Sequence, residues 1–171
     1  MKDRLPLQII LRAIGLALTA VGVVLIMYFS FIPGEQYPHI SWIPFADKGD
    51  HMAAYAFLGF SLFIATIQIP GSGKTVRENR KPHSTLHLTS WAGSSIILTL
   101  VLGTLFGLSI ELLQPFFGRS REWMDLASDC MGLVVGTALA LALLNLVGSY
   151  FATRPWLYDP NWKVEDHETL N

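Results

Sequence analysis

The sequence predicts an all-α, polytopic membrane protein in which four transmembrane helices form an antiparallel bundle. Only 15% of the 171 residues are charged, and 51% are hydrophobic. A soluble domain carries about 25% charged residues, so this chain lacks the charge that would cover a surface in water. Its apolar residues also form four long runs, each close to the roughly 20 residues that cross a bilayer core. These runs leave no room for a soluble catalytic domain.

The four predicted spans lie in a single integral membrane domain, residues 1–171, and cover residues 9–32, 52–69, 88–112 and 124–150. The pairs Pro33-Gly34 and Pro70-Gly71 follow the first two spans, and such pairs end helices. The first span is too long for the apolar part of a signal peptide, and no small-x-small cleavage site follows it. We therefore expect it to stay in the protein as a membrane helix.

The distribution of positive charge predicts the orientation of the spans. Nine of the twelve lysines and arginines lie in the two terminal segments, in the first turn of the first span (Arg12) and in the loop between the second and third spans. The positive-inside rule places that side in the cytoplasm. Both termini, including a tail at 152–171, are therefore expected in the cytoplasm, and the loops after the first and third spans are expected to face outward.

Composition also argues against several classes of function. The net charge is −1, so the chain has no basic surface of the kind that binds nucleic acid. Cys130 is the one cysteine and lies inside an apolar run, which excludes an internal disulfide. No motif assigns a cofactor or a metal ion.

Polar side chains are gathered at the outer ends of three predicted helices. Such groups are costly in a membrane and are usually functional. They are Asp47, Lys48, Asp50 and His51 before the second span, Glu111 and Gln114 at the end of the third, and Arg119, Arg121, Asp125 and Asp129 around the start of the fourth. The spans were assigned from apolar runs alone, yet the assignment places all of these polar residues on one side of the membrane. This agreement predicts a single site.

Spacings of four residues, and of three between Asp129 and Gly132, align these polar residues with small ones on the same helix faces. The stripes are His51, Tyr55 and Gly59 in the second span, Gly103, Gly107 and Glu111 in the third, and Asp125, Asp129, Gly132 and Gly136 in the fourth. Small residues four apart let helices approach closely. We expect the third and fourth spans to meet along these glycines, below a polar pocket at the outer end.

The residue types in the pocket suit acid/base chemistry or the binding of an anionic group. His51 can exchange protons near neutral pH, and neighbouring carboxylates cannot all stay ionised. We predict His51 and Glu111 as an acid/base pair, with Asp125 orienting His51 or an arginine. Spacing favours Arg121 over Arg119 as the partner of Asp125. Substrate contacts are predicted for Asp47, Lys48, Tyr55, Gln114, Arg119, Arg121 and Asp129.

Each of these groups also has a structural interpretation. Arg121 and Asp125 could be a simple ion pair at a helix start, where the helix dipole also favours an acid. The glycine stripes are typical of packing alone. The histidine and the carboxylates would also suit a hard cation, although no metal is assigned.

The order of these motifs resembles the VanZ-like family of small bacterial membrane proteins. The resemblance rests on Asp47-Lys48-x-x-His51-x-x-x-Tyr55-x-x-Leu58-Gly59, then Glu111-Leu112-x-Gln114, then Arg121-x-x-x-Asp125-x-x-x-Asp129-x-x-Gly132-x-x-x-Gly136, with Ser30 and Pro33 after the first span. It implies a cell-envelope protein of the bacterial cytoplasmic membrane. The founding member of the family is associated with resistance to the glycopeptide teicoplanin, and no reaction is carried over from it.

Two hypotheses follow from these observations. In the first, the outward polar pocket binds a membrane lipid or a lipid-linked cell-wall precursor and acts on it. In the second, the protein has an accessory or transport role, and the polar cluster holds helices together or relays protons. Turnover of envelope lipids that is lost on His51→Ala, with folding retained, would separate the two.

Overall fold

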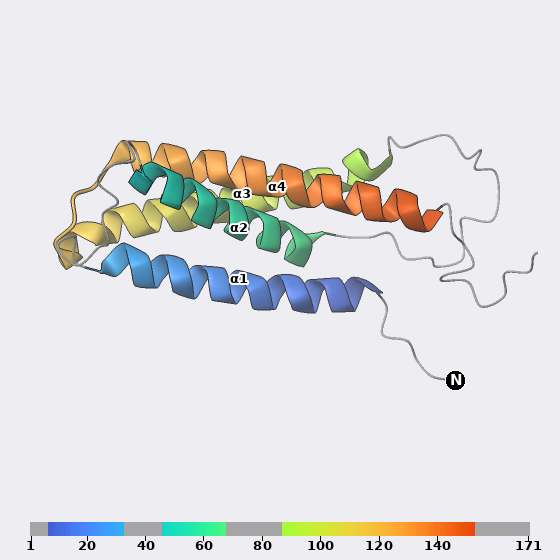
Figure 1. The fold of residues 1–171 in the computed structure, drawn as a ribbon, viewed down its shortest axis with the longest axis horizontal. Helices are drawn as coiled ribbons and strands as arrows, with labels where there is room; N and C mark the ends of the chain where they lie inside the picture. Colours follow the sequence, from blue (N-terminus) through green and yellow to red (C-terminus); the bar gives the residue numbers. More distant parts are fainter. Residues whose placement is uncertain (1–6, 33–45, 68–86, 153–171) are drawn as a thin grey trace, which may run out of the picture. The chain divides into compact units, whose positions relative to one another are not determined.

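The structure, a computed structural model, describes residues 7–32, 46–67 and 87–152, with side chains placed within 9–32, 48–67 and 92–147. Over these residues the chain is all-helical, and the predicted all-α class is confirmed. The elements are α1 (Leu7–Phe31), α2 (Ala46–Thr66), α3 (His87–Leu113), the short 3₁₀-helix η2 (Gln114–Phe117) and α4 (Trp123–Ala152) (Figure 1). Residues 33–45 of the loop after the first predicted span, the basic loop at 71–87 apart from His87, and the tail beyond 152 lie outside the described residues.

The chain divides into two compact units, Met1–Ala140 and Leu141–Asn171. The first unit contains α1, α2, α3, η2 and the part of α4 up to Ala140. The described part of the second unit is the remainder of α4, as far as Ala152. Every polar residue that the sequence singles out lies in the first unit.

Three of the described helices are long and apolar enough to cross a membrane. The candidate spans are Ile9–Phe31, Ala92–Phe117 and Trp123–Val147. Large apolar side chains on all three are more than half exposed, for example Leu16, Ile97 and Leu139. In water this exposure would be unfavourable, whereas lipid tails would cover it without cost.

The second predicted span, residues 52–69, is not among these candidates within the described chain. Its helix, α2, begins at Ala46 rather than near residue 52, so Lys48, Asp50 and His51 lie in its first turns. Charged side chains lower the mean hydropathy of this helix. Among them Asp50 is exposed, whereas Lys48 and His51 are partly buried against the aspartates of α4, and the second half of α2, residues 58–66, is mostly buried by its neighbours.

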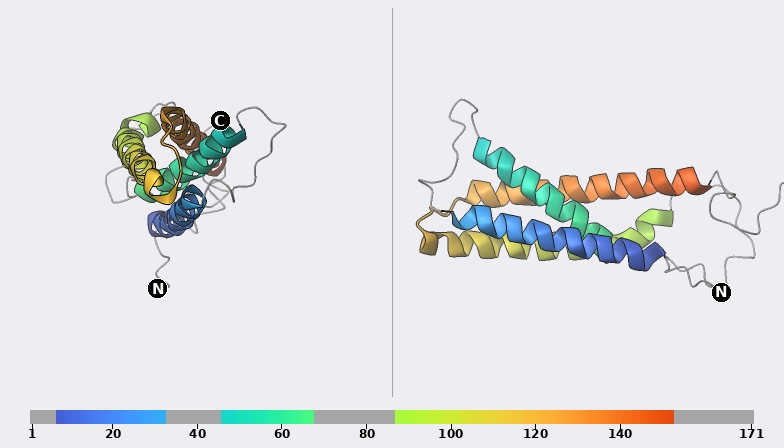
Figure 2. Two further views of the ribbon diagram at one scale, coloured as in Figure 1. Left: turned by 90° about the vertical axis from the view of Figure 1, so that its left-hand side faces the viewer. Right: turned by 60° about the horizontal axis from the view of Figure 1, so that its bottom comes forward.

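Glycines allow α2 to pack closely on its neighbours. A side chain at Gly15 of α1 would overlap the backbone of Ala65, near the end of α2, and a side chain at Gly136 of α4 would overlap the backbone of Ala56. Figure 2 shows the consequence: α2 runs obliquely to the other helices. Its first half lies against α4 and its last turns lie against α1.

The glycine seam of α4 therefore faces a different helix from the one expected. Side chains at Gly132 and Gly136 would overlap Met52 and Ala56 of α2. The expectation that this seam joins the third and fourth spans is wrong. The α3 glycines do face α4, and they leave room for its side chains. Gly103 lies against Leu133, and a Cβ added at Gly107 would lie 3.1 Å from Asp129 Oδ2.

The buried core draws on all four helices. It contains Ile26 of α1, Tyr55 and Leu58 of α2, Ile110 of α3 and Leu133 of α4. This cluster lies directly beneath the polar residues, because Tyr55 is one turn from His51 and Ile110 precedes Glu111. Water is therefore excluded from one side of the polar site.

A tight reversal at η2 joins α3 to α4. Pro115 stands in the first turn of η2, and Gly118 ends it with a left-handed conformation, φ 75°. Glycine adopts this conformation without the steric cost of a Cβ. The N–H groups of Gly118 and Arg119 donate back to the carbonyls of Pro115 and Gln114. The reversal brings the start of α4 beside the end of α3.

Candidate functional site

The predicted site residues at the ends of α2, α3 and α4 meet in the structure. Lys48 and His51 of α2 contact Asp125 and Asp129 of α4. Glu111, near the end of α3, contacts the start of α4. Residues about 75 positions apart along the chain are thereby brought within hydrogen-bond distance.

His51 lies between two carboxylates of α4. Its Nδ1 donates to Asp129 Oδ1 at 2.9 Å, and its Nε2 lies 3.6 Å from Asp125 Oδ2. The four-residue spacing of the two aspartates places both on the face that meets α2. The imidazole is therefore held in one orientation by groups on its two nitrogens.

The surroundings of His51 favour its protonated form. Burial by itself lowers the pKa of the imidazole, but the hydrogen bond to Asp129 and the charges of Asp129, Asp125 and Glu111 outweigh it. The pKa of His51 is therefore raised above its ordinary value of 6.5. This is the effect expected of a carboxylate neighbour on a histidine.

Lys48 supplies the fixed positive charge of the cluster. Its ammonium donates to Asp125 Oδ1 and, at 2.6 Å, to Glu122 Oε2. Asp125 is buried and Glu122 is half exposed. The lysine therefore ties the start of α2 to the start of α4 at the edge of the site.

Glu111 uses one carboxylate oxygen to hold the start of α4. Its Oε2 accepts from the backbone N–H of Glu122 at 3.2 Å, directly before the first residue of the helix. An acid at a helix N-terminus is stabilised by the helix dipole and by the free N–H groups there. The other oxygen, Oε1, is buried and has no hydrogen-bond partner in the described part of the chain.

Further buried polar atoms lie in the same region. Both polar atoms of the Gln114 amide have no hydrogen-bond partner among the described residues, and the Tyr55 hydroxyl interacts with the Asp129 carboxylate. Asp129, Tyr55 and Gln114 are each at most 1% exposed. Gly107 provides the space for two of these groups, since a Cβ there would lie 3.1 Å from Asp129 Oδ2 and 3.3 Å from the Tyr55 oxygen.

Arg121 does not take the place expected for it. Its Nε donates to the backbone carbonyl of Glu111 at 3.4 Å, and over the described residues it forms no ion pair with either Glu111 or Asp125. The expected four-residue spacing does not apply, because α4 begins at Trp123 and Arg121 precedes the helix. Lys48 occupies the position beside Asp125 that the sequence analysis gave to this arginine.

Two other predicted residues differ in how they reach the site. Arg119 donates from Nη1 to the carbonyl of Phe29 at 3.2 Å, which ties the turn after η2 to the end of α1. Stacking of Phe31 on Phe117, with ring centroids 4.3 Å apart, supports the same contact. The side chain of Asp47 lies outside the described residues.

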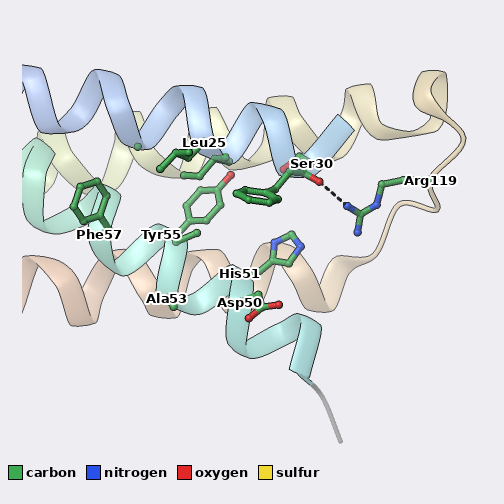
Figure 3. Close-up of a pocket in the computed structure, with 12 residues that line it drawn as sticks. Leu25, Ser30, Asp50, His51, Ala53, Tyr55, Phe57 and Arg119 are labelled. Atoms are coloured by element: carbon green, nitrogen blue, oxygen red, sulfur yellow. Dashed lines mark hydrogen bonds between the residues drawn. The ribbon is translucent and has the colours of Figure 1, made fainter. Parts of the chain in front are cut away.

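A pocket of about 450 Å³ lies beside the polar cluster, between α1 and α2. Most of its wall is apolar, with Leu25, Ile26 and Phe57 among the lining residues. Ser30, Asp50, His51 and Arg119 provide its polar groups. Figure 3 shows Arg119 and His51 toward one end and Phe57 toward the other. His51 and Tyr55 belong both to this pocket and to the polar cluster.

The sequence analysis missed the contribution of α1 to the site. It drew the site from three segments, whereas α1 forms one wall of the pocket. Ser30 was the available signal, because it is a polar residue at the outer end of an apolar span. Glu122 was also missed as a partner of Lys48. As an acid in a loop it carries no spacing pattern that would have identified it.

Comparison of the chain with protein-family models, with curated proteins and with solved structures finds no match. Over the described residues the protein is all-helical, with three helices long and apolar enough to cross a membrane and with a partly buried cluster of histidine, lysine and carboxylates where α2, α3 and α4 meet.

Proposed function

We propose that this chain is a bacterial cell-envelope protein that binds a membrane lipid or a lipid-linked cell-wall precursor in the pocket between α1 and α2. The pocket carries the proposal. Its wall is apolar over most of its length, and its polar groups include Arg119 and His51. An amphiphile with an acyl or prenyl chain and an anionic headgroup matches this distribution, because the chain would lie along Leu25 and Phe57 and the headgroup near the arginine.

The proposal includes a fourth transmembrane helix. In it, α2 crosses the membrane together with the three candidate spans, and all four are antiparallel. Burial of the second half of α2 by its neighbours supports this arrangement, together with the partial burial of Lys48 and His51, since polar side chains shielded from lipid are tolerated. Positive-inside charge supports cytoplasmic termini in the cytoplasmic membrane. Labelling of a cysteine placed at Gly118 by an impermeant reagent from outside the cell tests the orientation, and protection of that position would contradict it.

The polar cluster supplies groups that could act on a bound headgroup. His51 lines the pocket and is held by Asp129 and Asp125. His51 and Glu111 form the proposed acid/base pair, and Asp125 orients His51. Resemblance of the motif order to the VanZ-like family supports a role in the envelope, with resistance to glycopeptides such as teicoplanin as one setting for it.

A second candidate is an accessory role without covalent chemistry. The ion pairs from Lys48 to Asp125 and Glu122 favour it, because they join α2 to α4 as a structural clamp would. In that case the cluster serves the folding of the bundle or the relay of protons. Loss of folding on His51→Ala would favour this candidate over the first.

Photolabelling tests the pocket directly. The probe is phosphatidylglycerol with a diazirine in one acyl chain, presented to the purified protein in vesicles. We expect label on peptides that contain Leu25, Ile26 and Phe57. Ala53→Phe places a large side chain in the pocket lining and should remove most of this label. Ala127→Phe is the matched control, because Ala127 is exposed on α4 and does not line the pocket.

Equal labelling of wild type and Ala53→Phe would contradict the pocket assignment. Incubation of the folded protein with total envelope lipid, followed by mass spectrometry, then separates binding from chemistry. A product formed by wild type and absent with His51→Ala supports an enzyme. Binding without any product supports the accessory role.

A further inference from the structure

We propose that His51, Glu111 and Asp129 form a binding site for a divalent transition-metal ion of the Zn²⁺ or Mn²⁺ type. Each of the three side chains comes from a different helix and offers one ligand atom, and these atoms all lie within 4.8 Å of one another. One imidazole nitrogen and two carboxylate oxygens are a donor set that such ions accept. Ca²⁺ and Mg²⁺ fit less well, because they prefer ligand shells made of oxygen alone.

An unpartnered buried oxygen gives independent support. Glu111 is 2% exposed and Asp129 is 1% exposed. Glu111 Oε1 has no hydrogen-bond partner among the described residues, whereas the Asp129 carboxylate interacts with the Tyr55 hydroxyl. A buried carboxylate oxygen without a partner is costly. A metal ion between the two acids would satisfy Glu111 Oε1 and neutralise both carboxylates.

The charges of the cluster point the same way. Three carboxylates, those of Glu111, Asp125 and Asp129, lie around His51. Lys48 neutralises Asp125, which leaves two acids facing one imidazole. Protonation of His51 would compensate only one of them, whereas a divalent ion compensates both. Bound cations are often the dominant charge of such sites.

The geometry requires the three ligand atoms to move closer together. Two ligands in a tetrahedral Zn²⁺ site, each about 2.1 Å from the ion, are about 3.4 Å apart. Atoms that now lie within 4.8 Å of one another must therefore approach by up to about 1.4 Å. Glu111 offers its unpartnered Oε1 for this, while its Oε2 accepts from the backbone of Glu122.

The metal site stands independently of what occupies the pocket. An ion bound here would take His51 and Glu111 as ligands and so replace the acid/base pair proposed for the metal-free chain. The tests can therefore fail separately: photolabelling of the pocket requires no metal, and metal binding requires no lipid.

The experiment measures metal bound to the full chain, purified in detergent with an affinity tag that contains no histidine. The protein is treated with a chelator, desalted and titrated with ZnCl₂ or MnCl₂. Bound metal is then counted by elemental mass spectrometry and affinity is measured by calorimetry. We expect one ion per chain. Glu111→Gln, Asp129→Asn and His51→Ala should each weaken binding by at least about tenfold, the scale on which metal sites respond to altered ligation.

Asp50→Asn is the control, because Asp50 is an exposed acid one position from His51 and is outside the proposed ligand set. It should bind like wild type. Thermal unfolding in metal-free buffer shows whether each variant is folded, and Glu111→Gln keeps the shape of the side chain if His51→Ala fails to fold. The proposal is wrong if chelated wild type takes up no ion, or if Glu111→Gln and Asp129→Asn bind as tightly as Asp50→Asn. Neutralisation of the acids by protons would then be the explanation.

Discussion

Two stretches of the interface between α2 and α4 show how one helix pair serves both packing and the site. In the lower stretch, Gly132 and Gly136 lie against the backbone of Met52 and Ala56. One to two turns nearer the starts of both helices, Lys48 and His51 face Asp125 and Asp129 across the same interface. In the first stretch the glycines of α4 meet the backbone of α2, with Leu133 between them in the apolar core. In the second stretch the aspartates of α4 meet polar side chains of α2.

The comparison indicates that the glycines set how closely α2 and α4 approach, and thereby how deeply the polar groups beside them are buried. At Gly136 the two backbones approach so closely that no side chain fits between them. The polar side chains beyond this contact are therefore enclosed on that side. We infer that the seam controls folding and that the polar stretch controls binding, so substitutions in the two stretches should separate these properties.

The largest expected effect is that of Gly136→Leu. The added side chain would overlap the backbone of Ala56, which cannot yield as a side chain can. We expect a loss of at least about 3 kcal/mol in unfolding free energy, at or beyond the upper end for overpacked cores. Measurement is by denaturant unfolding in detergent and by abundance in the membrane.

Gly93→Leu is the matched control, because a Cβ at Gly93 meets nothing within 4 Å. It should change stability little. Equal losses from the two variants would show that any leucine in a helix of this protein is harmful, and the seam would lose its special role. His51→Ala should stay folded beside them, as the separation of the two stretches requires.

An intermediate effect is expected for Lys48→Ala. The substitution leaves Asp125 buried without its cation, and breaking such a pair costs several kcal/mol when fully buried. Lys48 is 18% exposed, so we expect about 2 kcal/mol. The double variant Lys48→Ala/Asp125→Asn should recover most of this loss, because the stranded charge is gone. Unfolding free energies of wild type, Lys48→Ala, Asp125→Asn and the double variant form a double-mutant cycle. Simple additivity of the two single effects would show that the two residues do not interact.

The smallest effect is expected for Arg121→Ala. The exposed arginine donates one long hydrogen bond to a backbone carbonyl, so its removal should change unfolding free energy by no more than about 0.5 kcal/mol. Its spacing in the sequence instead predicted that it pairs with Asp125, which would make its loss as harmful as that of Lys48. Thermal unfolding of Arg121→Ala beside Lys48→Ala distinguishes the two assignments. A loss for Arg121→Ala equal to that for Lys48→Ala would restore the original one.

Hydropathy and glycine spacing determined a large part of this protein without reference to its structure. Apolar runs of about 20 residues can only form helices that bury their backbone polar groups within a membrane, and the all-helical fold follows from them. The alternation of spans also carried His51, Glu111, Asp125 and Asp129 to one end. Their meeting could be predicted because helices joined in turn place every second helix end on the same side.

Tertiary structure decided which residues of this set touch. Helical spacing shows which residues share a face, but it does not show which neighbour that face meets, and the oblique course of α2 turned the Gly132–Gly136 seam toward α2 instead of α3. The start of α4 at Trp123 removed Arg121 from the helical register and left Asp125 to Lys48. Both outcomes depend on contacts between segments far apart in sequence. A small difference in packing angle decides which helix the glycine seam meets, and a small difference in helix boundary decides which of several cations pairs with Asp125.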